Sequence, residues 1–188
     1  MTDLELLDAW RSNDAKAGQE LVTRHWSAIS RFFRAKVGDD GADLISQTFL
    51  ACVEGKETIE NVRAYLFGVA RRRLADHFRT RARAPGMDLA MSSLADLAPG
   101  PATELDRHQR AELLMVALTR IPLDDQIAIE LSYFEGLSTR ELAAVLEIPE
   151  NTVRSRLSRA RDKLRAALAG LGTPEEAALA ESQLVGTE

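Results

Sequence analysis

The sequence has little of what marks a disulfide-rich, membrane-bound or catalytic protein. Its single cysteine, Cys52, excludes a disulfide framework and any multi-cysteine zinc site within one chain. No stretch approaches the roughly 20 apolar residues that span a bilayer, and the first ten residues lack a positive start followed by an apolar run. No Gly-rich phosphate loop, metal-ligand cluster or nucleophile-base pair appears. We therefore expect a cytoplasmic protein that is not an enzyme, with no membrane association, metal or cofactor.

The charge of the chain is distributed very unevenly. Lys and Arg number 24 against 29 Asp and Glu, a net charge of -5, and this balance alone would argue against a nucleic-acid ligand. Yet residues 63–83 hold seven arginines and one acid, and residues 154–165 hold six basic residues and one acid. The acids gather at the two ends of the chain. This polarity predicts separate surfaces for separate partners.

The residue pattern is helical nearly throughout. Ala, Leu, Arg and Glu dominate, and no β-branched run alternates with period two, which predicts an all-α fold. Gly38 is expected to end one helix, Asp39 or Asp40 to cap the next and Asn61 to cap the one after. The expected helices are 3–11, 14–37, one ending near 53, 62–83, 104–120, 124–134, 139–147 and one from 149 or 150 to about 168.

A segment without periodicity divides these helices into two groups. Residues 84–103 contain Pro85, Gly86, Pro99, Gly100 and Pro101, a composition typical of a flexible linker. The predicted architecture is two small helical domains joined by this linker. Proteolytic cleavage is expected near its glycines.

The strongest local motif lies in the second domain. Ser138 and Glu141 form a capping box for a short helix, and Ile148 and Pro149 form a turn before a longer one, the spacing of a helix-turn-helix. At 100° per residue, an apolar stripe on the longer helix is formed by Val153, Leu157, Ala160 and Leu164.

The opposite side of that helix is polar and basic. Its N-terminal half carries Arg154, Ser155, Ser158 and Arg159, side chains able to reach base edges and phosphates in a major groove. A solvated basic helix is the alternative for a charge run alone. Because the capping box, the turn and the amphipathic pattern coincide, DNA binding is favoured.

Two stretches resemble one known family. Residues 133–143, YFEGLSTRELA, and 148–161, IPENTVRSRLSRAR, resemble the promoter minus-35-binding domain of extracytoplasmic-function sigma factors, in the sigma-70 family. Residues 63–71, RAYLFGVAR, with Asp76 and His77, resemble the other domain of the same family, as do Asp43 and Leu44 followed by 48–50, TFL. The resemblance implies a sigma factor that binds RNA polymerase core and directs promoter-specific initiation.

The resemblance also implies a role for each part of the chain. Residues 1–84 (sigma region 2) would bind the clamp coiled coil of the polymerase and the minus-10 element, and residues 85–106 would form the linker. Residues 107–170 (sigma region 4) would bind the minus-35 duplex and the flap. The acidic tail, residues 171–188, has no family counterpart. Family positions that touch minus-35 DNA correspond to Arg154, Ser155, Ser158 and Arg159, with Ser138, Thr139 and Arg140 near phosphates.

For the first domain the resemblance implies contacts with the non-template strand and with the polymerase. The residues expected near the minus-10 element are Arg71, Arg72, Arg73, Asp76 and Arg79, with Arg81 beyond them. A solvated helix face is the alternative for these arginines. Aromatic residues of this helix, Tyr65, Phe67 and Phe78, are expected in the core rather than against bases, and Cys52 and His77 are read as packing and surface residues.

The sequence departs from the family in two functional places. Arg72 stands where an asparagine often meets the minus-10 strand, and Ala42, Ser46 and Gln47 stand where Glu, Gln and Glu are common. The polymerase-binding face would then consist of Asp40, Asp43, Ser46 and Gln47, with fewer carboxylates than usual. Phosphorylation of Ser46, or of Thr48, by a Ser/Thr kinase would restore the charge and could take the place of an anti-sigma factor; an ordinary surface serine is the alternative.

A tail helix over about 174–183 is also expected, capped by Thr173 with Glu176, and its glutamates could shield the basic helix, although a frayed, solvated end is the alternative. Two rival functions remain at this point. A helix-turn-helix regulator would bind operators without polymerase, and a helical adaptor would sequester another regulator without touching DNA.

Overall fold

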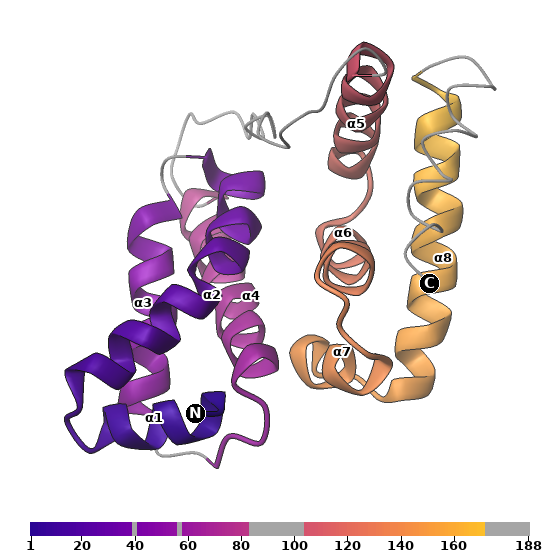
Figure 1. Cartoon of the computed structure of the whole chain (residues 1–188). Helices are drawn as coiled ribbons and strands as arrows, with labels where there is room; N and C mark the ends of the chain where they lie inside the picture. Colours follow the sequence, from indigo (N-terminus) through magenta and orange to yellow (C-terminus); the bar gives the residue numbers. More distant parts are fainter. Residues whose placement is uncertain (39–40, 56–57, 83–103, 172–188) are drawn as a thin grey trace. The chain divides into compact units, whose positions relative to one another are not determined.

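The computed structural model describes residues 1–38, 41–55, 58–82 and 104–171, and these residues are organised as helices (Figure 1). The chain divides into two compact units, Met1–Ser92 and Ser93–Glu188. The boundary falls inside the linker expected from sequence. Residues 84–103, the tail from 172 onward and the cap expected at Asp39 or Asp40 lie outside the described residues, whereas residues 104–106, which the family resemblance placed in the linker, begin a helix.

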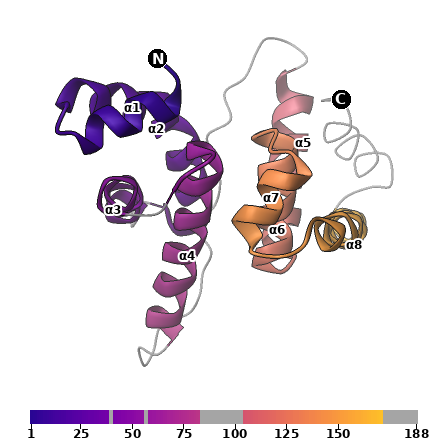
Figure 2. The same ribbon diagram turned by 90° about the horizontal axis from the view of Figure 1, so that it is seen from below.

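The first unit consists of α1 (Asp3–Arg11), α2 (Ala15–Val37), α3 (Gly41–Glu54) and α4 (Val62–Ala82). Each helix packs against α2 or α3, and α4 packs against both. Their apolar faces form one core, and its largest fully buried side chains include Leu6, Leu21, Ile29, Phe33, Phe67 and Leu74. Figure 2 shows α3 end-on beside α4.

The ends of these helices follow the capping residues in the sequence. Asp14 accepts hydrogen bonds from the amides of Lys16 and Ala17 at the start of α2, and Asn61 accepts one from Ala64 at the start of α4. Gly38 ends α2 with φ 58°, a left-handed conformation that suits glycine. The caps expected at Gly38 and Asn61 are confirmed. A capping box between Thr2 and Glu5, which sequence reading overlooked, starts α1.

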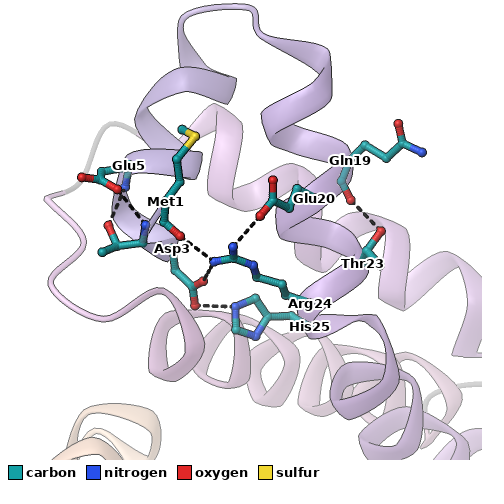
Figure 3. A network of polar contacts seen from close by, with 9 residues as sticks. Met1, Asp3, Glu5, Gln19, Glu20, Thr23, Arg24 and His25 are labelled. Atoms are coloured by element: carbon teal, nitrogen blue, oxygen red, sulfur yellow. Dashed lines mark hydrogen bonds and ion pairs between the residues drawn. The ribbon is translucent and has the colours of Figure 1, made fainter.

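The N-terminus is fastened to α2 by a polar network (Figure 3). The Arg24 guanidinium donates to the Met1 carbonyl at 2.9 Å and to the Asp3 carboxylate at 3.1 Å, and it pairs with Glu20. The His25 Nε2 lies 2.7 Å from the second Asp3 oxygen. Although partial burial raises the pKa of Asp3, hydrogen bonds from Arg24 and His25 outweigh that effect and leave the pKa below its ordinary value.

One large apolar side chain of α2 lies outside its buried stripe. Leu21, Ile29, Phe32 and Phe33 are buried, whereas the Trp26 side chain is 47% exposed. The indole lies at the flank of the buried stripe and stacks on the Phe49 ring of α3, with 6.2 Å between ring centroids and 10° between planes. Because α3 covers only one side of the indole, the other side faces solvent.

The second unit consists of α5 (Glu104–Thr119), α6 (Leu123–Ile129), a π-helical turn η2 (Glu130–Phe134), α7 (Thr139–Leu146) and α8 (Glu150–Ala169). One continuous α-helix was expected over 124–134. Instead, the amide of Glu135 donates to the carbonyl of Glu130 at 3.1 Å, a bond to the fifth preceding residue that widens the last turn. The core of this unit includes Leu114, Leu118, Ile129, Ala160, Leu164 and Leu168.

Candidate nucleic-acid interface

The helix-turn-helix predicted from sequence is present in α7 and α8. Ser138 Oγ accepts a hydrogen bond from the amide of Glu141 at 3.3 Å, and a Glu141 carboxylate oxygen accepts one from the amide of Ser138 at 2.7 Å, which confirms the capping box. After α7, Glu147 adopts the left-handed conformation (φ 57°, ψ 41°), and the next helix begins after Pro149. This tight turn holds α8 at a defined angle to α7.

The packing of α8 determines which side faces solvent. Val153, Ala160, Leu164 and Leu168 are buried, and Leu157 is half-buried, so the expected apolar stripe is present. It packs against α5, α6 and α7; Figure 2 shows α8 nearly end-on beside α6 and α7. Because one side is fully committed to the core, the opposite side is available to a ligand.

The four expected base-contacting residues share that available side. Arg154, Ser155, Ser158 and Arg159 are all exposed and lie in the first half of α8. The Ser155 hydroxyl donates to the carbonyl of Thr152 at 3.0 Å, and Arg159 Nε donates to the carbonyl of Ser155 at 3.2 Å. These bonds keep both side chains close to the helix surface.

The residues expected near phosphates lie at the start of α7. Ser138 and Arg140 are exposed and Thr139 is half-buried. The Ser138 hydroxyl already donates to the Glu141 carboxylate at 2.7 Å, so its role is to cap the helix. A phosphate at this site would meet backbone amides and the Arg140 guanidinium rather than that hydroxyl.

The basic residues of α8 are not equivalent, which sequence reasoning missed. Arg156 pairs with Asp124 of α6 at 3.3 Å, and Lys163 pairs with Asp125. Farther along, Arg165 pairs with Asp162 at 3.1 Å. The pairs between helices depend on how α6 packs on α8, so no local sequence spacing could have revealed them.

A second basic surface lies on α4 in the first unit. Arg72, Asp76 and Arg79 are exposed, whereas Arg71, Arg73 and Arg81 are half-buried. Asp76 and Arg79 form an ion pair with each other. The expected minus-10 residues therefore share one helix, and two of them partly neutralise one another.

The aromatic side chains of α4 divide between core and surface. Phe67 is fully buried, as expected, while Tyr65 and Phe78 are half-buried. His77, also half-buried, meets the Phe78 ring edge-on with 5.7 Å between centroids. Burial raises the pKa of the Cys52 thiol to about 12, which fits the packing role expected of this residue.

A third surface is the outer face of α3. Asp43 and Ser46 are exposed and Gln47 is half-buried; Asp40 lies outside the described residues. Gln47 Nε2 donates to the Asp43 carboxylate at 2.6 Å. The expectation for Thr48 is wrong: its side chain is 0% exposed and its hydroxyl donates to the carbonyl of Leu44 at 2.7 Å, so a kinase could not reach it in the folded chain.

Metal-binding clusters and membrane-spanning helices are both absent from the residues that the structure describes. Over those residues, no group of three or more His, Cys, Asp or Glu side chains is placed to hold a metal ion. Within the same ranges no helix is both long and apolar enough to cross a membrane.

The fold and the exposed face of α8 define a helix-turn-helix protein with the features of a DNA-binding protein. Residues 111–164 match the family described as sigma-70, region 4. Among characterised proteins, the chain is 28% identical to RNA polymerase sigma factor NccH of Alcaligenes xylosoxydans over 89% of its length and 97% of that protein. It is 29% identical to ECF RNA polymerase sigma factor SigL of Mycobacterium tuberculosis over 85% and 93% of the two chains.

Two solved structures resemble the chain over most of its length. CnrH, determined in complex with the cytosolic domain of CnrY, is 26% identical with a TM-score of 0.65, over 90% of this chain and 99% of that one. The sigma factor RpoE of Bartonella quintana, determined with the anti-sigma factor NepR, is 26% identical with a TM-score of 0.63, over 80% and 95%. These matches support placing the chain with the extracytoplasmic-function sigma factors of the sigma-70 family.

Proposed function

We propose that this protein binds RNA polymerase core in the cytoplasm and directs it to promoters without performing chemistry itself. The observation that carries the proposal is the set of four exposed polar side chains in the first half of α8, presented by a helix-turn-helix whose other face is buried. Arg154 and Arg159 would read guanines or hold phosphates of a minus-35 duplex, with Ser155 and Ser158 between them.

The first unit would hold the polymerase and the minus-10 element. Arg71, Arg72, Arg73 and Arg79 of α4 would attract the non-template strand through its phosphates. The outer face of α3, with Asp43, would meet the clamp coiled coil. We also propose that an anti-sigma factor controls the protein, because both structural neighbours were determined with another protein, and for the sigma factor RpoE that protein is the anti-sigma factor NepR.

Run-off transcription with core polymerase and a promoter library tests the proposal. Specific transcripts should appear only when both core and this protein are present. A gel shift of the selected promoter, with and without core, separates the proposal from a helix-turn-helix regulator acting alone. Specific operator binding without core, combined with no gain in transcription when core is added, would overturn the proposal.

A further inference from the structure

Arg156 lies in the DNA-facing half of α8 but is held by a carboxylate of its own chain. Its guanidinium is 3.3 Å from the Asp124 carboxylate, and its side chain is 26% exposed. Arg154 and Arg159, which flank it in sequence, are exposed. Arg156 therefore differs from Arg154 and Arg159 in being less exposed and in pairing with a carboxylate of another helix.

The position of Arg156 is suitable for a phosphate contact. It precedes Arg159 by three residues, and residues three apart are neighbours on a helix surface. A guanidinium released at this position would lie beside that of Arg159. Carboxylate and phosphate both accept the same paired N–H donors of arginine, so they compete for it.

Asp124 is well placed to be that competitor. It lies in the first turn of α6, and its side chain is 46% exposed, so the pair stands at the surface where a DNA backbone could approach. We propose that Asp124 withholds Arg156 from DNA and makes it a reserve phosphate-binding residue, which limits the affinity of α8 for its duplex. This inference rests on the proposed DNA-binding role of α8.

The chain supplies a matched pair as a control. Asp125, next to Asp124, holds Lys163 of the same helix. Lys163 lies seven residues beyond Arg156, about 10 Å farther along α8 and outside its first half. The Asp125 side chain is only 10% exposed, so this pair fastens α8 to α6 rather than competing with DNA.

The test measures binding of full-length protein to a duplex over a series of salt concentrations. Each additional phosphate contact makes the slope of log affinity against log salt steeper by about 0.9. Asp124→Asn should steepen the slope by that amount and tighten binding at moderate salt about two- to fivefold, the factor that corresponds to an exposed ion pair. Asp125→Asn should lower thermal stability and leave the slope unchanged.

Two further variants decide between release of Arg156 and simple removal of a negative charge. In Asp124→Asn combined with Arg156→Ala the slope should return to the parent value, whereas Arg156→Ala alone, which leaves Asp124 without this partner, should not steepen the slope. An unchanged slope in Asp124→Asn, a gain that survives in the double variant, or a steeper slope in Arg156→Ala alone would each overturn the inference. If the parent itself fails to bind any duplex, with or without core, the proposed function fails instead.

Discussion

The His25 imidazole of α2 lies 2.7 Å from the carboxylate of Asp3 at the start of α1, a contact that joins two helices across 22 residues of sequence. The Arg24 guanidinium donates a hydrogen bond to the other oxygen of the same carboxylate at 3.1 Å. The first turn of the protein is therefore fixed to the middle of its second helix by one acid and two neighbouring bases.

Asp3→Asn should destabilise the first unit at neutral pH, and the effect should disappear in acid. The pKa of Asp3 is lower in the folded chain than its ordinary value, so ionised Asp3 stabilises the fold at neutral pH, and this contribution is lost as the pH falls through the lowered pKa. We expect a loss of roughly 0.5–1.5 kcal/mol at pH 7, as for one hydrogen bond. Urea unfolding of parent and variant at pH 7 and in acid measures it, with Asp8→Asn, an exposed acid of α1, as control.

Arg154→Ala and Arg159→Ala should weaken promoter binding without weakening attachment to core. Loss of a good base contact costs about 1–3 kcal/mol, roughly five- to 150-fold in affinity. Arg165→Ala is the matched control, because this arginine lies in the second half of α8 and pairs with Asp162. Equal transcription by all three variants on every promoter would show that α8 is not the recognition helix.

Gly18→Ala should destabilise the first unit. The indole of Trp10 lies so close to Gly18 that a β-carbon there would stand 2.5 Å from it, and the half-buried indole would have to move. Overpacking of this kind costs about 1–3 kcal/mol. At Gly170 a β-carbon would have ordinary contacts of 3.6 Å, so Gly170→Ala should leave calorimetric stability unchanged or slightly higher.

Adding negative charge to the outer face of α3 should tighten binding to core. Gln47 already engages the Asp43 carboxylate, and Ser46, exposed beside them, donates to the carbonyl of Ala42. We propose phosphorylation of Ser46 as the source of charge, because a phosphate adds about 1.5–2 negative charges. Phosphorylated protein and Ser46→Glu should bind core more tightly than the parent and Ser46→Ala.

Ala42→Glu provides the matching control on the same face, since it adds a negative charge by substitution and does not depend on phosphorylation. It should reproduce the effect of Ser46→Glu. If the unmodified parent binds core as tightly as the phosphorylated protein, phosphorylation does not control the interaction.

Local features of this fold were predictable because their causes are local. The capping box of Ser138 and Glu141, the turn at Pro149 and the apolar stripe of α8 all follow from residues a few positions apart. The exposed polar side of α8 follows in turn from that stripe. A cap of the same kind at Thr2 was equally readable but overlooked.

Features that depend on packing between helices were not predictable in this way. The pairing of Arg156 with Asp124 requires α6 to lie against α8, and the exposure of Trp26 reflects how far α3 extends over α2. The π-helical turn after α6 breaks a sequence pattern that continues as an ordinary α-helix through Phe134. The periodicity of apolar residues shows which side of a helix is buried. It does not show which residue of another helix lies opposite, or where a turn takes in an extra residue.

Both tryptophans of the chain lie in the first unit, so intrinsic tryptophan fluorescence reports on that unit alone. Trp10 lies against Gly18, while Trp26 stacks on Phe49 with 47% of its side chain open to solvent, and the second unit has no tryptophan. A soluble quencher should therefore lower the fluorescence intensity of Trp26 in the free protein. Because the indole of Trp26 stacks on Phe49 of α3, polymerase bound to that helix should reduce the quenching of Trp26. DNA bound to α8 should leave the quenching unchanged.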